Sequence, residues 1–350
     1  MMEGTKLIGY VGTYTKGNSE GIYTFLLNTE TGKITDIKLA AKLDNPTYLA
    51  ISSDNQFLYS VIKEGEAGGI AAFKIIDGEL IMINKQVTDG APPCHVSIDM
   101  TSSHAFSANY HKGTVESFLI DEKDGSVLPA SSIIKHKSQE GDNSPHTHYA
   151  STTPDEKYII AVDLGIDQVI LYDVKNGLLT EKNSYSVPPG SGPRHLVFHP
   201  NGEYVYIMTE FSSEIIAFQY DSETASLTRY QNISTIPEDF RENNQGSAIH
   251  ISSDGRYIYA GNRGHDSIAI FTVNPESGKL TFIEHTSTLG NWPRDFALDP
   301  TENFMVISNQ NSNNLVLFSR DKLTGKLTLL QSDIAVPEPV CVKFLNIMDK

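Results

Sequence analysis

A repeat of roughly 50 residues constrains this chain more than any other feature of its sequence. Six segments combine a turn signal with a β-rich run, as in SSDGRYIYAG, and the runs begin at Phe57, His104, Tyr158, Tyr204, Tyr257 and Phe304. A seventh copy begins near Leu7. The runs are short and alternating, and no segment shows convincing helical periodicity. The repeat therefore predicts small β-sheets and excludes a helical solenoid.

Each repeat carries four strand-like segments. The β-rich run is followed by a second alternating segment, such as GIYTFLLN or NNLVLFSR, and then by a short turn, such as Asp77-Gly78 or Thr324-Gly325, that leads into a third strand. A further short segment, such as GPRHLVFH, precedes each turn signal. Four antiparallel strands in each of seven repeats predict an all-β fold, the seven-bladed β-propeller.

The two ends of the chain fit a closed ring. The first repeat lacks the segment that precedes the turn signal, whereas the C-terminal segment EPVCVKFLN is such a segment with no further strands after it. We predict that this last strand completes the first blade, which removes an open sheet edge. Because no Pro/Ser-rich or low-complexity linker interrupts the sequence, residues 1–350 are predicted to form a single domain.

Composition excludes several classes of partner. The formal net charge of −16 argues against nucleic acid and against an anionic membrane. No apolar stretch approaches the ~18 residues of a membrane helix, and the N-terminal segment does not resemble a secretory signal. The only cysteines, Cys94 and Cys341, have no zinc-binding spacing. We therefore expect a cytoplasmic protein, a monomer or weak oligomer, with reduced thiols.

Equivalent positions of the blades predict where a site lies. Six residues before the turn residue of each blade stand Thr47, Cys94, His148, Arg194, Ser247 and Arg294. Six residues after the first residue of the following strand stand Lys63, Tyr110, Leu164, Glu210, Arg263 and Gln310, with Thr13 in the first blade. Antiparallel neighbours bring the start of one strand beside the end of the next. Both sets, here called ring positions, should therefore lie at one end of the propeller, unless the register slips by one residue.

A single charged residue at such a position is usually solvated or structural. Here a histidine, a glutamate and several arginines converge in an acidic chain, which indicates an anion site. His95 and His195 follow ring positions by one residue, so they are expected to face the packing between sheets. Asp163 and Asn262 precede ring positions and could support their neighbours. His146 and His148 share a strand face without an acidic partner at ligand spacing, so no metal site is predicted.

The segments SPHTHYA, GPRHLVFHPNGEYVYIMTE and SDGRYIYAGNRGHDSIAIF resemble the lactonase family of seven-bladed propellers. That family includes the bacterial cycloisomerase-type 6-phosphogluconolactonase and the fungal carboxy-muconate lactonising enzyme. The resemblance extends from YVGTYT to PVCVKF, nearly the whole chain. One departure is Tyr149, where the family more often has serine, and this bears on the exact substrate.

The resemblance implies a metal-free, cofactor-free hydrolysis of 6-phospho-D-glucono-1,5-lactone. A His, two Arg and a Glu of the family carry over to His148, Arg194, Arg263 and Glu210. The arginines would bind, one the phosphate and the other the oxyanion or carboxylate. His148 or Glu210 is left as general base, with His148 favoured because its ordinary pKa lies near neutral pH.

Four further ring positions are expected to contact the substrate, and three rival functions are considered. Substrate contacts are expected from Arg294, Lys63, Tyr110 and Gln310, and the partner is a small anionic sugar lactone. The same residues could serve a muconate-type lactonising reaction or hydrolysis of another sugar lactone. A third possibility is a non-catalytic propeller that acts as a binding module.

Overall fold

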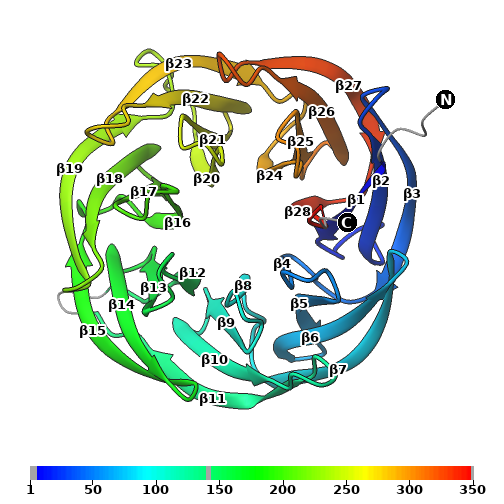
Figure 1. The fold of residues 1–350 in the computed structure, drawn as a ribbon, viewed down its shortest axis with the longest axis vertical. Coiled ribbons are helices and arrows are strands. Elements are labelled where there is room, and N and C mark those ends of the chain that lie inside the picture. The colour runs from blue at the N-terminus through cyan, green and yellow to red at the C-terminus, as the bar shows by residue number, and fades with distance from the viewer. Residues whose placement is uncertain (1–5, 139–142, 348–350) are drawn as a thin grey trace.

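The computed structural model describes residues 6–138 and 143–347, which form seven four-stranded antiparallel sheets arranged as blades of a ring (Figure 1). The prediction of an all-β, seven-bladed propeller is confirmed, and these residues contain no helix. The prediction of a single domain covers residues 1–350 and thus includes segments outside the described ranges.

The blades are numbered here in chain order, and each is written from its innermost to its outermost strand. The first three are blade 1, β28 (Pro339–Phe344), β1 (Lys6–Thr13), β2 (Gly21–Asn28) and β3 (Lys33–Lys42); blade 2, β4 (Leu49–Ile51), β5 (Phe57–Glu64), β6 (Ala67–Ile76) and β7 (Glu79–Asp89); and blade 3, β8 (His95–Ile98), β9 (His104–Asn109), β10 (Thr114–Ile120) and β11 (Val127–Lys135).

The other four are blade 4, β12 (Thr147–Thr152), β13 (Tyr158–Asp163), β14 (Gln168–Lys175) and β15 (Leu178–Ser186); blade 5, β16 (Pro193–Phe198), β17 (Tyr204–Thr209), β18 (Glu214–Asp221) and β19 (Ser226–Ser234); blade 6, β20 (Gln245–Ile251), β21 (Tyr257–Arg263), β22 (Ser267–Val273) and β23 (Leu280–Ser287); and blade 7, β24 (Pro293–Leu298), β25 (Phe304–Asn309), β26 (Asn314–Arg320) and β27 (Leu327–Ala335).

The ring closes through β28. This strand lies innermost in blade 1 and pairs antiparallel with β1, so that Val11 is opposite Val342 and Gly12 is opposite Cys341. The prediction that the last strand completes the first blade is confirmed. The two inner strands of one sheet thus come from opposite ends of the described chain.

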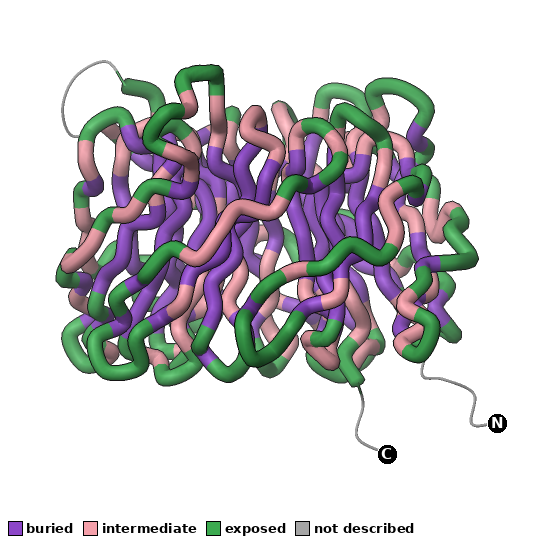
Figure 2. Tube along the Cα trace, turned by 90° about the horizontal axis from the view of Figure 1, so that it is seen from above, coloured by how far each residue is buried: buried purple, intermediate pink, exposed green. Residues whose placement is uncertain are grey.

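Burial follows the position of each strand within its blade. The second strands β17 and β25 are buried along their whole length, because blades pack against both of their faces. The outermost strand β3 has mostly exposed or half-buried residues. Figure 2 shows the same division, with buried segments along the strands and exposed segments at the loops and margins. The apolar core is therefore distributed between neighbouring blades.

A repeated hydrogen bond joins neighbouring blades. A tyrosine on the second strand of one blade donates its hydroxyl to the carbonyl oxygen of a turn glycine in the next blade. The four pairs are Tyr10–Gly78 (3.1 Å), Tyr59–Gly125 (3.1 Å), Tyr206–Gly278 (2.8 Å) and Tyr259–Gly325 (2.8 Å).

The turn itself explains why glycine occupies that position. Gly125 has a φ of +76°, and a Cβ atom there would lie 2.3 Å from the ring of Phe57. Both the left-handed backbone and the close approach of the neighbouring blade therefore favour glycine.

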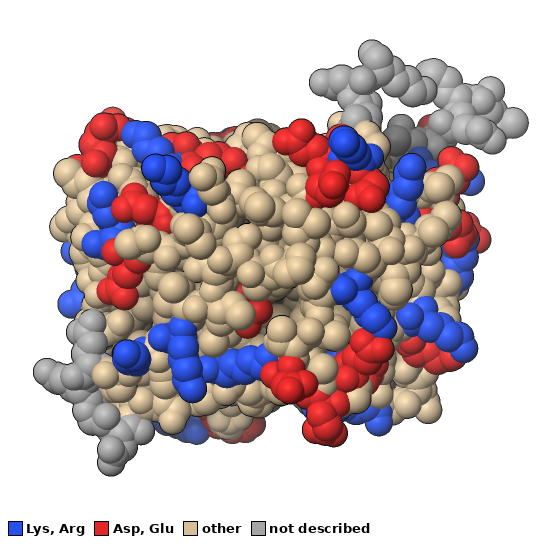
Figure 3. Space-filling view, turned by 90° about the horizontal axis from the view of Figure 1, so that it is seen from below, with Lys and Arg blue, Asp and Glu red and all other residues tan. Residues whose placement is uncertain are grey.

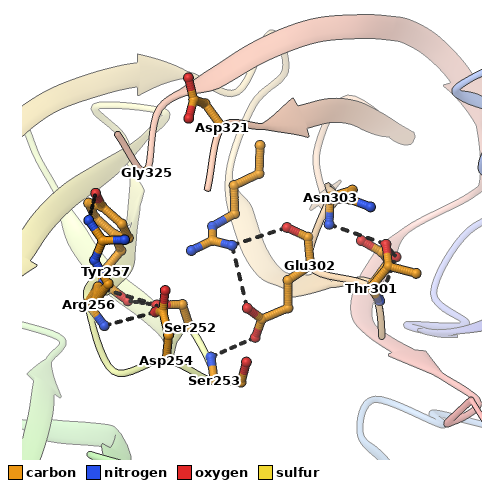
Figure 4. A network of polar contacts seen from close by, with 12 residues as sticks. Ser252, Ser253, Asp254, Arg256, Tyr257, Thr301, Glu302, Asn303, Asp321 and Gly325 are labelled. Carbon is orange, nitrogen blue, oxygen red and sulfur yellow. Dashed lines mark hydrogen bonds and ion pairs between the residues drawn. The ribbon is translucent and has the colours of Figure 1, made fainter. Parts of the chain in front are cut away.

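An additional polar network ties blade 7 to blade 6 (Figure 4). Oε1 of Glu302 accepts a hydrogen bond of 2.7 Å from the backbone N–H of Ser253, in the turn between β20 and β21. Nη1 of the buried Arg320 donates to the carbonyl oxygen of Glu302 (3.1 Å), and its Nε donates to the hydroxyl of Tyr259 (2.7 Å). Ser253 follows the C-terminal end of β20. The network therefore lies at the end of β20 that is opposite to its first residue, Gln245.

The outer wall carries charges of both signs. In the view of Figure 3, basic and acidic side chains lie mainly toward the upper and lower margins, with a short row of basic side chains at the lower left. Within the described ranges the chain has no helix of the length and hydropathy needed to cross a membrane.

Candidate active site

Three ring positions on the innermost strands are the extra residues of β-bulges. In β12, Thr147 pairs with Asp163 and Tyr149 with Val162, which leaves His148 as the extra residue. The same irregularity leaves Arg194 unpaired in β16 and Arg294 unpaired in β24. A bulge re-aims the side chain of its extra residue. These three side chains line cavities at the centre of the ring.

A pocket of about 620 Å³ opens where these strands begin. Its walls include six of the eight residues predicted from ring positions: His148, Glu210, Arg263, Arg294, Lys63 and Tyr110. Arg194 lies in a small cavity of about 30 Å³ whose walls also include His148 and Arg294. Gln310 is not among the lining residues, and its buried side-chain oxygen has no hydrogen-bond partner among the described residues.

Two arginines from neighbouring blades meet at one carboxylate oxygen. Oε2 of Glu210 lies 2.8 Å from Nη2 of Arg263 and 3.1 Å from Nε of Arg194. The side chains of Arg263 and Arg194 are only 3% and 2% exposed. Arg263 is held further by a hydrogen bond of 2.7 Å from Nη2 to the carbonyl oxygen of Gly246.

These neighbours determine the protonation states at the site. Burial alone would raise the pKa of Glu210, but the charges of Arg263 and Arg194 outweigh burial and hold this pKa below its ordinary value. Burial lowers the pKa of His148 well below its ordinary value, and Arg194, Arg294 and Arg263 lower it further. At neutral pH, Glu210 is therefore a carboxylate and His148 is a neutral imidazole.

Several buried polar atoms at the site have no hydrogen-bond partner in the described parts of the chain. They are Nδ1 of His148, Nη1 of Arg194 and Oγ of Ser247, all at ring positions on innermost strands. Buried polar groups are nearly always satisfied by protein, water or ligand. Three such atoms at equivalent positions of three neighbouring blades are the arrangement expected where a polar ligand binds.

Sequence reasoning missed two aromatic residues of the pocket wall. Trp292 has a φ of +65°, its backbone N–H donates to Oδ1 of Asp266 (2.8 Å), and its ring lies 5.6 Å from the guanidinium carbon of Arg263. Tyr14 lies under two cations, with Nζ of Lys16 at 4.4 Å and the guanidinium carbon of Arg294 at 5.3 Å from its ring centre. Both residues lie next to strand ends, Trp292 before β24 and Tyr14 after β1, at positions that the count did not include.

His95 and His195 correct one expectation. Their rings meet across the channel and do not face the packing between sheets. The ring of His95 lies 4.3 Å from that of Tyr48, 4.2 Å from that of Tyr149 and 5.7 Å from that of His195. These four side chains line the channel, where the ring of His195 lies 5.2 Å from that of His148.

Asp163 and Asn262 support the neighbouring backbone and side chains. Oδ1 of Asp163 accepts a hydrogen bond from the backbone N–H of His146 (2.8 Å), and its Oδ2 lies 2.6 Å from Nδ1 of the buried His136. Asn262 exchanges two hydrogen bonds of 2.7 Å with Thr235. Asp163 thus fixes the start of β12, one residue before the bulge that aims His148.

His146 has a different role from His148. Its ring stacks on that of Tyr110 at 4.2 Å, and its Nδ1 lies 2.8 Å from the carbonyl oxygen of Tyr110. Within residues 6–138 and 143–347, no group of three or more His, Cys, Asp or Glu side chains is arranged to hold a metal ion.

Residues 8–344 match the protein family described as "Lactonase, 7-bladed beta-propeller". The chain belongs to this lactonase family. A relative from Bacillus subtilis (strain 168), named 6-phosphogluconolactonase, is 54% identical over 347 residues, which are 98% of this chain and 99% of the relative. The resemblance seen in the sequence is therefore confirmed at the level of the family.

Two solved structures share the fold of this chain. A crystal structure of a protein from Lactobacillus plantarum is 42% identical and superposes with a TM-score of 0.94, covering 98% of this chain and 100% of that one. The periplasmic gluconolactonase PpgL of Pseudomonas aeruginosa is 30% identical, with a TM-score of 0.92 over 98% of this chain and 100% of that one.

Proposed function

We propose that this lactonase-family protein hydrolyses 6-phospho-D-glucono-1,5-lactone to 6-phosphogluconate, the ester hydrolysis of the oxidative pentose phosphate route. The name of the Bacillus subtilis relative supports this substrate. The observation that carries the proposal is the meeting of Arg194 and Arg263 at Glu210, beside a neutral His148 with an unpartnered Nδ1.

In the proposed mechanism, His148 is the general base. Its neutral imidazole accepts a proton from a water molecule as the water oxygen bonds to the lactone carbonyl carbon. The carbonyl oxygen becomes an oxyanion, and Arg263 with Arg194 stabilises it. When the intermediate collapses, the bond between the carbonyl carbon and the ring oxygen breaks, and the proton on His148 passes to that oxygen. The new carboxylic acid then releases its proton to solvent.

Glu210 has an orienting role in this scheme. A carboxylate held between two guanidinium groups is a weak base, because protonation would break both ion pairs. Its charge also offsets part of the repulsion between Arg194 and Arg263, so that both can remain buried at the pocket floor. Glu210 therefore acts by positioning the two arginines.

The proposal extends to partners and setting. The substrate is a small anionic sugar lactone, and the cations of the pocket wall complement it within an acidic chain. We further propose a cytoplasmic monomer or weak oligomer that works as one domain, without metal or cofactor, and that binds neither nucleic acid nor membrane. The net charge of −16 supports the last two statements.

The test is hydrolysis of freshly generated 6-phosphogluconolactone by the purified protein in EDTA, measured against the spontaneous rate. His148→Ala and Arg263→Ala should each lower kcat by about 10²–10³-fold. Lys33→Ala, which removes an exposed charge at the start of β3, is the matched control. Wild-type activity no faster than buffer would exclude the proposed reaction, and activity lost in EDTA would exclude the metal-free mechanism.

An unphosphorylated sugar lactone is the second candidate substrate. The gluconolactonase from Pseudomonas aeruginosa shares the fold and 30% of the sequence, and its name includes no phosphate. The two candidate substrates differ by one phosphate group, so the choice between them depends on whether the pocket can bind a phosphate.

A further inference from the structure

The polar side chains of the pocket come from two sets of blades on opposite sides of the ring, and the side chains of each set are called an arc here. His148 lies on blade 4, Arg194 and Glu210 on blade 5, and Arg263 on blade 6; these four residues are the paired arc. Arg294 lies on blade 7, Lys16 in the loop after β1 of blade 1, and Lys63 on β5 of blade 2; these three are the unpaired arc. In Figure 1 blades 4–6 and blades 7, 1 and 2 occupy opposite sides of the ring.

The two arcs differ in how their charges are compensated. Both buried arginines of the paired arc form ion pairs with Glu210. In the part of the chain that the structure describes, no carboxylate forms an ion pair with Arg294, Lys16 or Lys63. The acidic residue of the pocket wall on that side is Glu66. The wall there therefore has three positive charges and one negative charge. The larger uncompensated positive charge therefore lies on the unpaired arc.

Arg294 is the residue best placed to receive an anion. It is the extra residue of the bulge in β24, and it lines both the main pocket and the small cavity beside His148. Its guanidinium stacks over Tyr14, which supports its plane while leaving its N–H groups available. A planar guanidinium with unused donors suits bidentate contact with phosphate oxygens.

We propose that the unpaired arc, led by Arg294 with Lys63 and Lys16, is the phosphate subsite, whereas Arg194 and Arg263 serve the lactone carbonyl. This inference rests on the proposed function. It differs from the expectation that one arginine of the Arg194–Arg263 pair binds the phosphate, because both of those arginines already share a carboxylate. In the substrate, the phosphate is esterified to the exocyclic carbon. The ring carbon that carries this exocyclic carbon is joined to the carbonyl carbon through the ring oxygen.

The inference also selects between the two candidate substrates. A pocket of about 620 Å³ lies within the usual range of about 300–1,000 Å³ for small-molecule sites. With the carbonyl at the paired arc, the phosphate would lie beside Arg294, which lines the small cavity together with His148 and Arg194. The chain should therefore prefer the phosphorylated lactone over glucono-1,5-lactone.

The experiment measures kcat/KM for both lactones in the wild type and in Arg294→Ala, Lys63→Ala, Arg263→Ala and Lys33→Ala. Arg294→Ala should lower the ratio of kcat/KM, phosphorylated over unphosphorylated, by about 10–100-fold, mainly through KM, and Lys63→Ala should lower it less. Arg263→Ala should lower both values together. Lys33→Ala should leave the ratio unchanged.

Two outcomes would overturn the inference: an unchanged ratio in Arg294→Ala, as would follow from an equal fold-loss with both lactones, or a wild type that hydrolyses only the unphosphorylated lactone. If the wild type hydrolyses neither, the proposed function fails, and inorganic phosphate then decides the subsite. Phosphate that raises the Tm of the wild type but not that of Arg294→Ala would support the subsite, whereas equal shifts would refute it.

Discussion

Nη2 of Arg263, at the end of β21, lies 2.8 Å from Oε2 of Glu210, which follows β17 in the neighbouring blade. This ion pair crosses the boundary between blades 5 and 6 at the floor of the pocket. It combines a structural bond between blades with the charge arrangement of the proposed site. Variants of Glu210 should therefore affect both stability and activity.

Glu210→Gln should lower the free energy of unfolding by about 3–5 kcal/mol, because it leaves two buried arginines without their counter-charge. It should also lower kcat/KM, since Arg194 and Arg263 would repel each other. Urea unfolding and lactone hydrolysis measure the two effects. Glu223→Gln, which alters an exposed ion pair with Lys157, is the control and should change neither. Unaltered stability in Glu210→Gln would mean that water molecules, and not Glu210, compensate the buried charges of the two arginines.

The pH profile should reveal the protonation state of His148. Only the neutral imidazole can act as a base, and its pKa is lowered by burial and by the arginines. Hence kcat/KM should stay level as the pH falls through about 6.5, the ordinary pKa of histidine, and decline only at more acidic pH. The profile should be recorded with glucono-1,5-lactone too, since a phosphate ester itself titrates near pH ~6. A half-maximal rate near pH ~6.5 with both substrates would contradict this.

Stability should also depend on pH in this range. His95, His148 and His195 have pKa values well below the ordinary value, with burial as the main cause. Below about pH 6.5 the unfolded chain binds protons that the folded chain does not, so the free energy of unfolding should decrease as the pH falls. Urea titrations between pH ~5 and ~8 measure this decrease. His195→Gln should reduce the slope by about one proton, and an unchanged slope would count against a buried neutral His195.

The tyrosine bonds between blades allow a matched pair of variants. Tyr59→Phe leaves the carbonyl oxygen of Gly125 without its hydroxyl partner and should cost about 1–2 kcal/mol of unfolding free energy. Tyr206→Phe should cost less, because Tyr230 also donates to the carbonyl oxygen of Gly278, at 2.9 Å. Thermal or urea unfolding gives the comparison. Equal losses would show that the second donor gives no compensation.

Trp292 should report on ligand binding, since it is the only tryptophan of the chain and lines the pocket. Titration with 6-phosphogluconate should change the intrinsic fluorescence in a saturable way, whereas glucose 6-phosphate, which lacks the carboxylate, should act only at higher concentration. Trp292→Phe should abolish the signal. A flat signal in an active enzyme would place the ligand away from Trp292.

The sequence repeat was enough to predict the blades, because each blade has the same local pattern of strands and turns. Counting within the repeat also located His148, Arg194 and Arg294, since the bulge recurs at the same place in several blades. It did not show which way the residues after the ring positions turn, so the orientation of His95 and His195 was predicted wrongly. Trp292 was missed because the count took one position in each innermost strand, and Trp292 stands two residues before that position in its blade.

The closure of the ring by β28 has a practical consequence. β1 runs from Lys6 toward the pocket and ends at Thr13. β28 starts at Pro339, beside Thr13, and runs away from the pocket to Phe344. Polypeptide joined before Lys6 or after Phe344 therefore departs from the face opposite the pocket mouth. Fusion partners, affinity handles or surface tethers attached on either side should leave substrate access free, so the protein can be immobilised with its mouth facing the solution.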